Sequence, residues 1–560
     1  MNLGREKMMP RLQAMAWHAA LRRSNGRMKK SLAIVGALIF LALVLRIAWV
    51  GDDGYITFRT LEQVVAGHGL RWNPHERVQA FTSPLWLFFL LIPRLVSSNV
   101  FLNALGVAFV LDAVLLVVLF QWARRDGLGF FVTLLLLVAS KGFFDYTTSG
   151  LESPLAYVLL ALFAWLVRVW TETTAQRPRW AFRVLVVANF VILTRYDLAL
   201  MVLPASLWVW LRTYPGTSWR FHLRAWGLAF SPLLAWVVFA FFYYGTPFPN
   251  TAYAKIPPGY PRWALLKDGV KYFVAMGMWD IASVLLLGSG LGLAAWAAWR
   301  FWRHRETRGQ TETLVPLLLG MGMVLHLGYI LWVGGDFMVG RFAAFDVLWA
   351  VMLVVWWAAQ NDASRRFLVL AIIGLVYVAA YPNTALNSPS LYTNPRMWKG
   401  ISDERGFYEE ASLFMYVHGH FADASRPFPP TAWTQDGLAF RQEPRTVIVA
   451  SNIGYFGYWA GTEKIIVDRY ALADPLLARL PAEFPSRIGH FKRPVPEGYV
   501  TTLETGELHI QDPDLKAYYR QLALVTQGPL WSWERLRAIV CLNVGCYCHY
   551  LRAWEVRHTR

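Results

Sequence analysis

The sequence predicts a polytopic α-helical membrane protein that carries a soluble domain at its C-terminal end. Hydrophobic residues make up 56% of the 560 residues and charged residues only 16%, whereas a soluble protein carries roughly a quarter charged residues. Apolar runs recur through the first two thirds of the chain at lengths close to the ~20 residues that cross a bilayer. After residue 384 no apolar run reaches that length. Lipid is therefore the main solvent of the region 31–384.

The first 30 residues form a basic leader that we expect in the cytoplasm. They carry eight Lys and Arg residues before any apolar run begins. The next segment, residues 31–50, is long enough to span a bilayer, and no small-residue cleavage site follows it. It is typical of a signal anchor, which stays attached to the protein.

Ten further apolar runs follow this anchor. They occupy residues 101–122, 129–144, 154–170, 181–194, 197–212, 225–243, 280–300, 313–333, 343–359 and 366–381. Lys and Arg mark cytoplasmic loops, and here they fill every second loop if the short run 84–96 is re-entrant or interfacial. The pattern predicts about eleven transmembrane helices in a bacterial cytoplasmic membrane, with the N-terminus inside and the C-terminus outside.

Residues 385–560 are predicted to form an extracytoplasmic domain of the α/β or α+β class. The segment 445–461 is typical of a buried strand followed by a glycine-rich turn, 463–468 is typical of a second strand, and 474–484 is typical of a helix. The segment 528–551 is either an amphipathic helix lying against the membrane or a helix packed inside the domain. Its cysteines lack a fourth ligand for zinc, so Cys541, Cys546 and Cys548 are free thiols or form one local disulfide.

The positive charge of the chain also fits a membrane protein. A net charge of +18 would suggest nucleic acid if the protein were soluble. Here the Lys and Arg residues lie between apolar runs, where they orient the chain in the bilayer. We expect membrane lipid as a partner and no nucleic acid.

Five polar motifs fall on the predicted outer side of the membrane. They are GDDGYITFR (51–59), DYTTSGLESP (145–154), TRYD (194–197), TPFPNTAYAK (246–255) and GGDFMVGR (334–341). A charge at the bilayer centre costs about 2.5–3.5 kcal/mol, so a carboxylate within the membrane usually has a function. This penalty decreases near the membrane surface, where a structural role is the alternative. The convergence of the five motifs on one face predicts a binding site there.

The adjacent carboxylates Asp52 and Asp53 are the most distinctive of these residues. In an extended segment, neighbouring side chains point to opposite sides, so one could face a substrate while the other orients it. The pair could instead hold a divalent cation such as Mg²⁺ or Ca²⁺, supply a general base, or simply cap a helix. Residues 55–67 predict a helix along the membrane and 81–93 a re-entrant segment, which gives a long, ordered outer loop over 51–99. A transporter would more typically show internal repeats.

The sequence resembles the GT-C superfamily of membrane glycosyltransferases, and within it the family of the mycobacterial terminal β-(1→2) arabinofuranosyltransferase. The residues that carry the resemblance are GDDGYITFR…GHGLRWNPHERVQAFTSPLW, SGLESP, TRYD, PFPNTAYAK, GGDFMVGR and IGYFGYWAG…DRYALADPLLARLP…RIGHFKRPVPEGY. They lie between about residues 45 and 530, and the leader and the Cys-bearing tail fall outside the pattern. The resemblance implies a GT-C type fold and sugar transfer from a polyprenyl-phosphate donor to a hydroxyl acceptor.

The resemblance also implies an active site. Asp52 is expected to be the catalytic carboxylate with Asp53 as its support, while Arg195, Lys255 and Arg341 are expected to bind the donor phosphate. The residues expected to contact substrate are Arg59, His68, Glu152, Tyr196, Asp197, Asn250 and Asp336, with Asn73 and His75 as further acceptor contacts. For each of these a structural role, such as a helix cap or a surface charge, is the alternative.

Three functions stay open at this point. The first is an arabinofuranosyltransferase acting on a cell-envelope arabinan or on a glycoprotein such as a pilin. The second is a related transferase that moves mannose or aminoarabinose from a lipid carrier. The third is a flippase of lipid-linked sugars. No cofactor is required for any of them, apart from the divalent cation considered beside Asp52 and Asp53.

Overall fold

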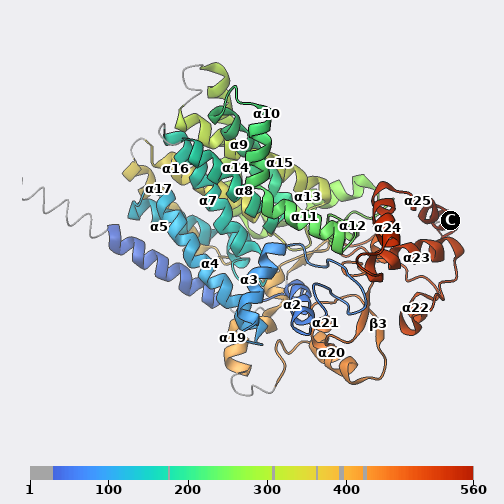
Figure 1. The fold of residues 1–560 in the computed structure, drawn as a ribbon. Coiled ribbons are helices and arrows are strands. Elements are labelled where there is room, and N and C mark those ends of the chain that lie inside the picture. The colour runs from blue at the N-terminus through green and yellow to red at the C-terminus, as the bar shows by residue number, and fades with distance from the viewer. Residues whose placement is uncertain are drawn as a thin grey trace, which may run out of the picture.

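A bundle of long helices and a smaller C-terminal part, drawn in orange and red in Figure 1, make up the protein. This computed structural model describes residues 29–173, 177–304, 310–360, 363–389, 396–420 and 426–558. The leader predicted for residues 1–30 lies almost wholly outside these ranges. The C-terminal part packs at the ends of the long helices (Figure 1).

Six helices in the described ranges are long and apolar enough to cross a membrane. They are Lys29–Ile47, α4 (Val100–Trp122), α7 (Ser153–Glu172), α14 (Ile281–Arg303), α15 (Thr311–Val333) and α17 (Ala363–Ala380). This confirms a multi-pass helical membrane protein. The predicted number of eleven spans is not confirmed, and the sidedness of the loops stays a prediction.

The predicted run 225–243 is not one helix. It consists of α10 (Trp219–Ala229) and α11 (Ser231–Tyr243), which meet at an angle of 72° and would together supply a seventh span. Pro232 lies in the first turn of α11. Because proline has no N–H to donate and its ring clashes with the preceding turn, the two helices cannot continue as one.

The remaining helices of the bundle are shorter. They are α2 (Asp52–Val65), α3 (Pro84–Arg94), α5 (Gly127–Ala139), α6 (Lys141–Asp145), α8 (Arg177–Thr194), α9 (Ala199–Thr213), α12 (Asn250–Lys255), α13 (Arg262–Trp279) and α16 (Ala344–Ala358). Nearly every residue of α16 is buried, as expected of an apolar helix surrounded by others. The apolar runs did not predict α13, because Lys267, Asp268 and Lys271 interrupt its sequence.

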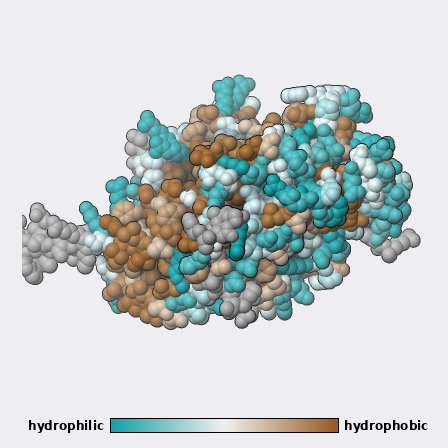
Figure 2. Space-filling model, turned by 90° about the horizontal axis from the view of Figure 1, so that it is seen from below, coloured by the Kyte–Doolittle hydropathy of each residue, from teal (hydrophilic) through white to brown (hydrophobic). Residues whose placement is uncertain are grey.

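Apolar side chains cover one end of the molecule. Figure 2 shows them as a broad brown area at the lower left, with smaller brown patches among hydrophilic residues elsewhere in the view. The exposed residues include Leu38 and Val110, each 62% exposed, on the first helix and on α4. Such a surface is expected where helices face lipid.

The C-terminal part is mostly helical with two small sheets. Its elements are β1 (Met397–Trp398), β2 (Ile401–Ser402), α18 (Glu404–Phe407), α19 (Leu413–Met415), α20 (Ala432–Gln442), β3 (Val447–Ala450), α21 (Tyr455–Trp459), β4 (Ile465–Asp468), α22 (Tyr499–Thr505), α23 (Pro513–Gln527), α24 (Trp533–Val544) and α25 (Cys548–His558). β3 and β4 pair in parallel, with Val447 opposite Ile465.

The two predicted strands in this part are confirmed by β3 and β4, whereas the predicted helix 474–484 is wrong. Only a single 3-10 turn, Leu477–Arg479, forms there. Pro475 and Pro481 flank this turn, and proline cannot donate the hydrogen bond that a longer helix would need. The assignment of the part to the α/β or α+β class, and its boundary at residue 385, stay predictions.

A short backbone pairing fixes the C-terminal part against the end of the first helix. Val50 N–H donates to the Ala411 carbonyl at 3.1 Å, and Leu413 N–H donates to the Ala48 carbonyl at 2.8 Å. The start of α2 is thereby held beside residues from the far end of the chain. A pocket lies at this junction.

Candidate active site

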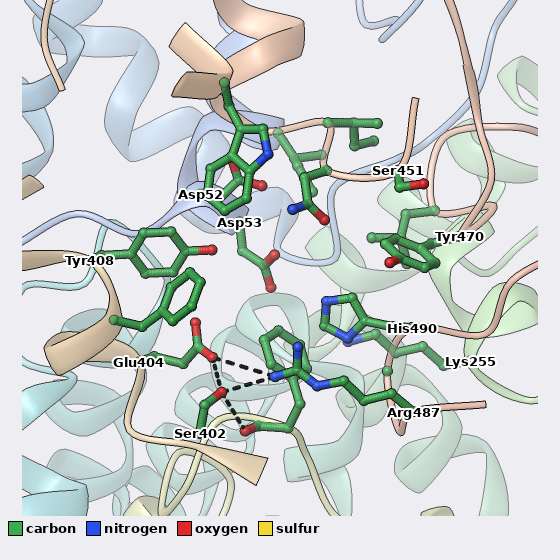
Figure 3. Close-up of a pocket in the computed structure, with 18 residues that line it drawn as sticks. Asp52, Asp53, Lys255, Ser402, Glu404, Tyr408, Ser451, Tyr470, Arg487 and His490 are labelled. Atoms are coloured by element: carbon green, nitrogen blue, oxygen red, sulfur yellow. Dashed lines mark hydrogen bonds and ion pairs between the residues drawn. The ribbon is translucent and has the colours of Figure 1, made fainter. Parts of the chain in front are cut away.

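The pocket lies between the start of α2 and the C-terminal part, and its empty volume is ≈ 800 Å³ including the space open to solvent. Figure 3 shows Glu404 and Tyr408 on one side of it and Lys255, Arg487 and His490 on the other. Carboxylates and cations therefore face the same space.

The sequence allows an extended segment at Asp52 and Asp53, but the structure shows a helix there. They are the first two residues of α2, after Gly51 in an extended conformation. Backbone N–H groups at a helix start have no acceptor within the helix and attract negative charge. Because the helix turns between neighbouring residues, the two carboxylates have different surroundings.

The Asp52 carboxylate is used to join α2 to the C-terminal part. It accepts hydrogen bonds from the backbone N–H of Tyr455 at 2.7 Å and of Gly454 at 3.1 Å. Burial raises the pKa of Asp52 to about 7, and the nearby charge of Asp53 adds to the effect. A side chain at Gly454 would place a Cβ 1.9 Å from the Asp52 carbonyl, so only glycine permits this approach.

The Asp53 carboxylate, in contrast, points into the middle of the pocket (Figure 3). Its side chain is 26% exposed, and one of its oxygens lies 3.7 Å from a guanidinium nitrogen of Arg341. Of the two predicted acids, Asp53 is therefore the one placed to meet a ligand.

Asp53 is the exposed end of a largely buried network of charges, which we call the ionic floor. It consists of Asp53, Glu152, Arg195, Asp197, Asp336 and Arg341. Arg341 lies 3.4 Å from Asp336 and 3.7 Å from Glu152. Because a buried charge without a partner is strongly destabilising, each cation of the floor is surrounded by carboxylates.

Arg195 forms the deeper half of the floor. Its guanidinium lies 2.6 Å from Glu152 and 2.7 Å from Asp197. Asp197 in turn lies 3.6 Å from His326 on α15, which hydrogen-bonds Asp346 on α16 at 2.7 Å. The network thus continues from the pocket into the helix bundle.

The ionic floor brings together six of the predicted site residues. Two of them, Arg195 and Arg341, have surroundings that differ from those expected. Arg195 and Arg341 were expected to bind the donor phosphate, yet neither lines the pocket. Both guanidinium groups contact carboxylates of the protein instead. Of the three predicted phosphate ligands, the structure places only Lys255 on the pocket wall.

Two predicted substrate contacts join parts of the protein instead of facing the pocket. Arg59 is fully buried and donates to the backbone carbonyls of Trp72, Gly457 and Lys464. Asn250 donates through its side-chain amide to the carbonyls of three residues between 471 and 474. Arg59 in α2 and Asn250 in α12 thereby hold their helices to the C-terminal part, which no local sequence pattern could indicate.

The other predicted contacts also lie away from the pocket lining. His68 hydrogen-bonds Gln63 at 2.6 Å, and the ring of Tyr196 packs edge to face on Phe248. Asn73 pairs through its amide with both backbone groups of Ile466 in β4, and His75 is mostly buried without a hydrogen bond at either ring nitrogen. The structure does not bring these side chains to the site.

Sequence reasoning missed several pocket residues in the C-terminal part. Burial raises the pKa of Glu404 to about 8, and the Ser402 hydroxyl donates a hydrogen bond to its carboxyl group. Arg487 lies 3.9 Å from Glu404 and stacks over the ring of Phe337. Burial and the charge of Arg487 lower the pKa of His490 to about 4, so its ring is neutral at pH 7.

Only one weak signal could have identified Arg487 and His490. Both lie in RIGHFKRPVPEGY, which carries part of the family resemblance, but no charge pattern or periodicity marks them. A backbone hydrogen bond from Glu483 N–H to the Lys492 carbonyl closes this segment into a hairpin-like loop. The tip of the loop carries both residues into the pocket.

Lys255 differs from the cations of the ionic floor. It lines the pocket at the end of α12. Within the described ranges no side-chain hydrogen bond or ion pair holds its ammonium group. This charge is therefore available to an anionic ligand.

Comparisons with known proteins confirm the resemblance inferred from the sequence. No family model matches the chain. It is 27% identical over 519 residues to the terminal beta-(1->2)-arabinofuranosyltransferase of Mycobacterium tuberculosis, covering 80% of this chain and 81% of that protein. It is 25% identical to the protein of the same name from Corynebacterium glutamicum, covering 79% and 73%.

Two solved structures were also found to be similar. One is the oligosaccharyltransferase of Archaeoglobus fulgidus, with a TM-score of 0.43 and 13% identity, where the match spans 78% of this chain and 62% of that one. The other is ArnT from Cupriavidus metallidurans bound to undecaprenyl phosphate, with a TM-score of 0.41 and 12% identity, spanning 78% and 85%.

Proposed function

We propose that this protein transfers an arabinofuranosyl residue from a polyprenyl-phosphate donor to an acceptor hydroxyl outside the cytoplasmic membrane. The acceptor class is a cell-envelope arabinan or a glycoprotein. The observation that carries the proposal is the position of Asp53, a carboxylate aimed into a pocket that also holds cations at the end of a membrane-helix bundle. The names of the two sequence relatives support the sugar.

In this proposal Asp53 is the general base. A positioned carboxylate removes the proton from the incoming hydroxyl as the new glycosidic bond forms. A guanidinium nitrogen of Arg341 lies 3.7 Å from one carboxylate oxygen of Asp53 and helps to hold the side chain in place. Asp52, which the resemblance favoured as the catalytic residue, becomes a positioning residue, because its carboxylate accepts two backbone hydrogen bonds.

The cations on the wall of the pocket stabilise the leaving group. When the bond between the sugar and the phosphate breaks, negative charge grows on the phosphate oxygens. Lys255 and Arg487 lie on the wall where such an anion would be held, and preorganised donors aimed at developing charge are among the strongest catalytic devices. His490 is neutral and can donate one hydrogen bond.

Glu404 gives the pocket a second carboxyl group with a different protonation state. Its pKa of about 8 keeps it protonated at neutral pH. A protonated carboxyl group donates a hydrogen bond and carries no charge that would repel a phosphate. We assign it to a sugar oxygen or a phosphate oxygen of the donor.

A divalent cation beside Asp52 and Asp53 stays a prediction. The described part of the chain has no group of three or more His, Cys, Asp or Glu side chains that could hold a metal ion. Such an ion would therefore need further oxygen ligands from the substrates. Loss of transfer in EDTA, restored by Mg²⁺, would support the ion, and an unchanged rate would contradict it.

The proposal is tested by offering the purified protein, in liposomes, a panel of polyprenyl-phosphate sugars with an arabinan oligosaccharide or a pilin-type glycoprotein as acceptor. We expect transfer from the arabinofuranose donor and little from the mannose and aminoarabinose donors. Preferred transfer of another sugar would replace the donor assignment. Movement of the lipid-linked sugar across the bilayer without transfer from any donor would instead establish a flippase.

A further inference from the structure

The C-terminal segment after residue 527 has no part in the proposed reaction. It forms α24 and α25, which fold back on α23, and Figure 1 shows α24 beside the end of α11. The described thiols of Cys541, Cys546 and Cys548 are free. Gly545, with a φ of 85°, ends α24, so the predicted helix 528–551 is in fact two helices.

One side of α24 is fixed to the end of α11. Arg535 is fully buried and donates to the carbonyls of Phe242 and Tyr243 at 2.7 and 2.9 Å. These are among the last carbonyls of α11, which have no partner within their own helix. Asn543 adds a hydrogen bond of 2.7 Å to the Gly245 carbonyl. The helix is therefore held at a definite place, where α11 ends.

The other side of α24 is an apolar face without a protein partner among the described residues. Trp533, Val540 and Val544 are 77%, 52% and 71% exposed. Together with Arg537 they follow a spacing of four, three and four residues, which places them on one side of the helix. Trp531, immediately before the helix, is 81% exposed. Exposed apolar surface of this kind marks an interaction site.

This face lies next to a helix whose own surface is also apolar and exposed, α11. Leu234 and Val238 on α11 are 57% and 59% exposed, as expected of a helix in a membrane. The ring of Trp531 lies 4.7 Å from the ring of Phe242 at the end of α11. Trp residues gather where a bilayer meets water, and Arg side chains reach from apolar surface to the headgroups. The composition Trp, Trp, Arg, Val, Val fits that interface.

We propose that the face formed by Trp531, Trp533, Arg537, Val540 and Val544 is seated in the membrane–water interface beside the end of α11. The ligand of this surface is the lipid bilayer itself, with the apolar side chains among the upper acyl groups and Arg537 at the phosphates. The C-terminal part is then attached to the membrane at a second place, in addition to its junction with the first helix.

The test uses the full-length protein in liposomes of phosphatidylcholine and phosphatidylglycerol. The three native cysteines are replaced by serine, and a fluorescent label is placed on Val540→Cys or Val544→Cys. Glu504→Cys, on the exposed surface of α22 in the same part of the protein, is the matched control. Because these positions are exposed, the labels do not disturb the core, and thermal unfolding checks that each variant is folded.

We expect a quencher attached to the lipid acyl chains to reduce the fluorescence at 540 and 544 but not at 504. Iodide in the water should do the opposite. Replacing Trp531 and Trp533 by serine should lower the lipid quenching at 540. Equal quenching by iodide at all three positions would overturn the proposal. Protection from both quenchers, with crosslinks between protein molecules, would overturn it in favour of a second copy of the chain.

Discussion

The ionic floor and the wall of the pocket, by which we mean Lys255, Arg487 and His490, differ in how their charges are neutralised. On the floor, Arg195 and Arg341 each contact at least two carboxylates of the protein. On the wall, Lys255 has no such partner within the described ranges, and Arg487 has only Glu404 at 3.9 Å. Charges that are buried among helices must be neutralised by the protein, whereas charges that reach the open pocket can be left for a ligand. We therefore expect the floor to fix the geometry of the site and the wall to bind the ligand.

The largest effect is expected at Asp53, which belongs to the ionic floor and also lines the pocket. Asp53→Asn keeps the shape of the side chain but removes the base, so transfer should fall by about 10²–10⁴-fold. Initial rates with the arabinofuranose donor give the measurement. Asp52→Asn is the matched control, because its loss should weaken the contact with Gly454 and Tyr455 more than the chemistry.

The two variants separate the two assignments. We expect Asp52→Asn to lower the temperature of thermal unfolding and to retain more activity than Asp53→Asn. A greater loss of activity in Asp52→Asn than in Asp53→Asn, with both proteins folded, would restore Asp52 as the catalytic residue.

The floor should respond to mutation mainly through stability. Arg341→Met leaves Glu152 and Asp336 without their shared cation, and breaking a buried pair costs about 3–5 kcal/mol. Thermal unfolding in detergent should show a large decrease. Arg445→Met removes an exposed ion pair with Glu443 and should change stability by only about 0–1 kcal/mol. Equal effects in the two variants would show that the floor is not held by its charges.

The wall should respond to mutation mainly through activity. Lys255→Met removes a cation from the pocket without breaking an ion pair of the described protein, so stability should be unchanged. The rate of transfer should fall by about 10²-fold, the loss typical of removing one group that stabilises developing charge. Lys492→Met, at an exposed residue at the base of the loop that carries Arg487 and His490, is the control and should be neutral. Normal transfer by Lys255→Met would remove it from the phosphate site.

The smallest expected effect is a change in pH dependence at Glu404. Its pKa of about 8 in the folded protein means that transfer should decrease as the pH rises through 8 and the carboxyl group ionises. Glu404→Gln always donates a hydrogen bond, so it should keep activity at pH 7 and lose that decrease. An unchanged pH–rate profile in Glu404→Gln would contradict the assigned proton.

The same group has a defined effect on stability. The pKa of Glu404 is higher in the folded protein than the ordinary value of 4.5, so the folded state binds the proton more tightly than the unfolded state. The contribution of Glu404 to stability is therefore fully present below pH 4.5 and is lost as the pH rises to about 8. Unfolding temperatures of the protein and of Glu404→Gln across this range test the sign.

Local hydrophobicity predicted most of the helices but not their breaks. The run 101–122 corresponds closely to α4, because the whole apolar run forms one unbroken helix. The bend between α10 and α11 depends on a single proline, which an average over many residues hides. Helix α13 was missed because three charged residues lower its hydropathy while its apolar side chains pack on α14 and α15.

The site was predictable to the extent that its residues lie at helix ends. Glu152, Arg195 and Asp336 come from different motifs, and the predicted sidedness alone placed them together. The roles were less predictable because they depend on distant contacts. Asp52 and Arg59 form hydrogen bonds with backbone groups about 400 residues later in the chain, at Gly454 and Gly457 respectively. The signal that would reveal such contacts is absent from any local stretch of sequence.

The contact between Asp52 and the start of α21 has a consequence for the biosynthesis of the protein. Asp52 emerges from the ribosome early, but its hydrogen-bond donors at Gly454 and Tyr455 are made only after most of the chain has been translated. Until then the segment that begins with α2 lacks the side of the pocket that carries Arg487 and His490. A nascent or prematurely ended chain therefore has only one side of the pocket. We therefore expect a chain that ends before residue 454 to be inactive in the proposed transfer.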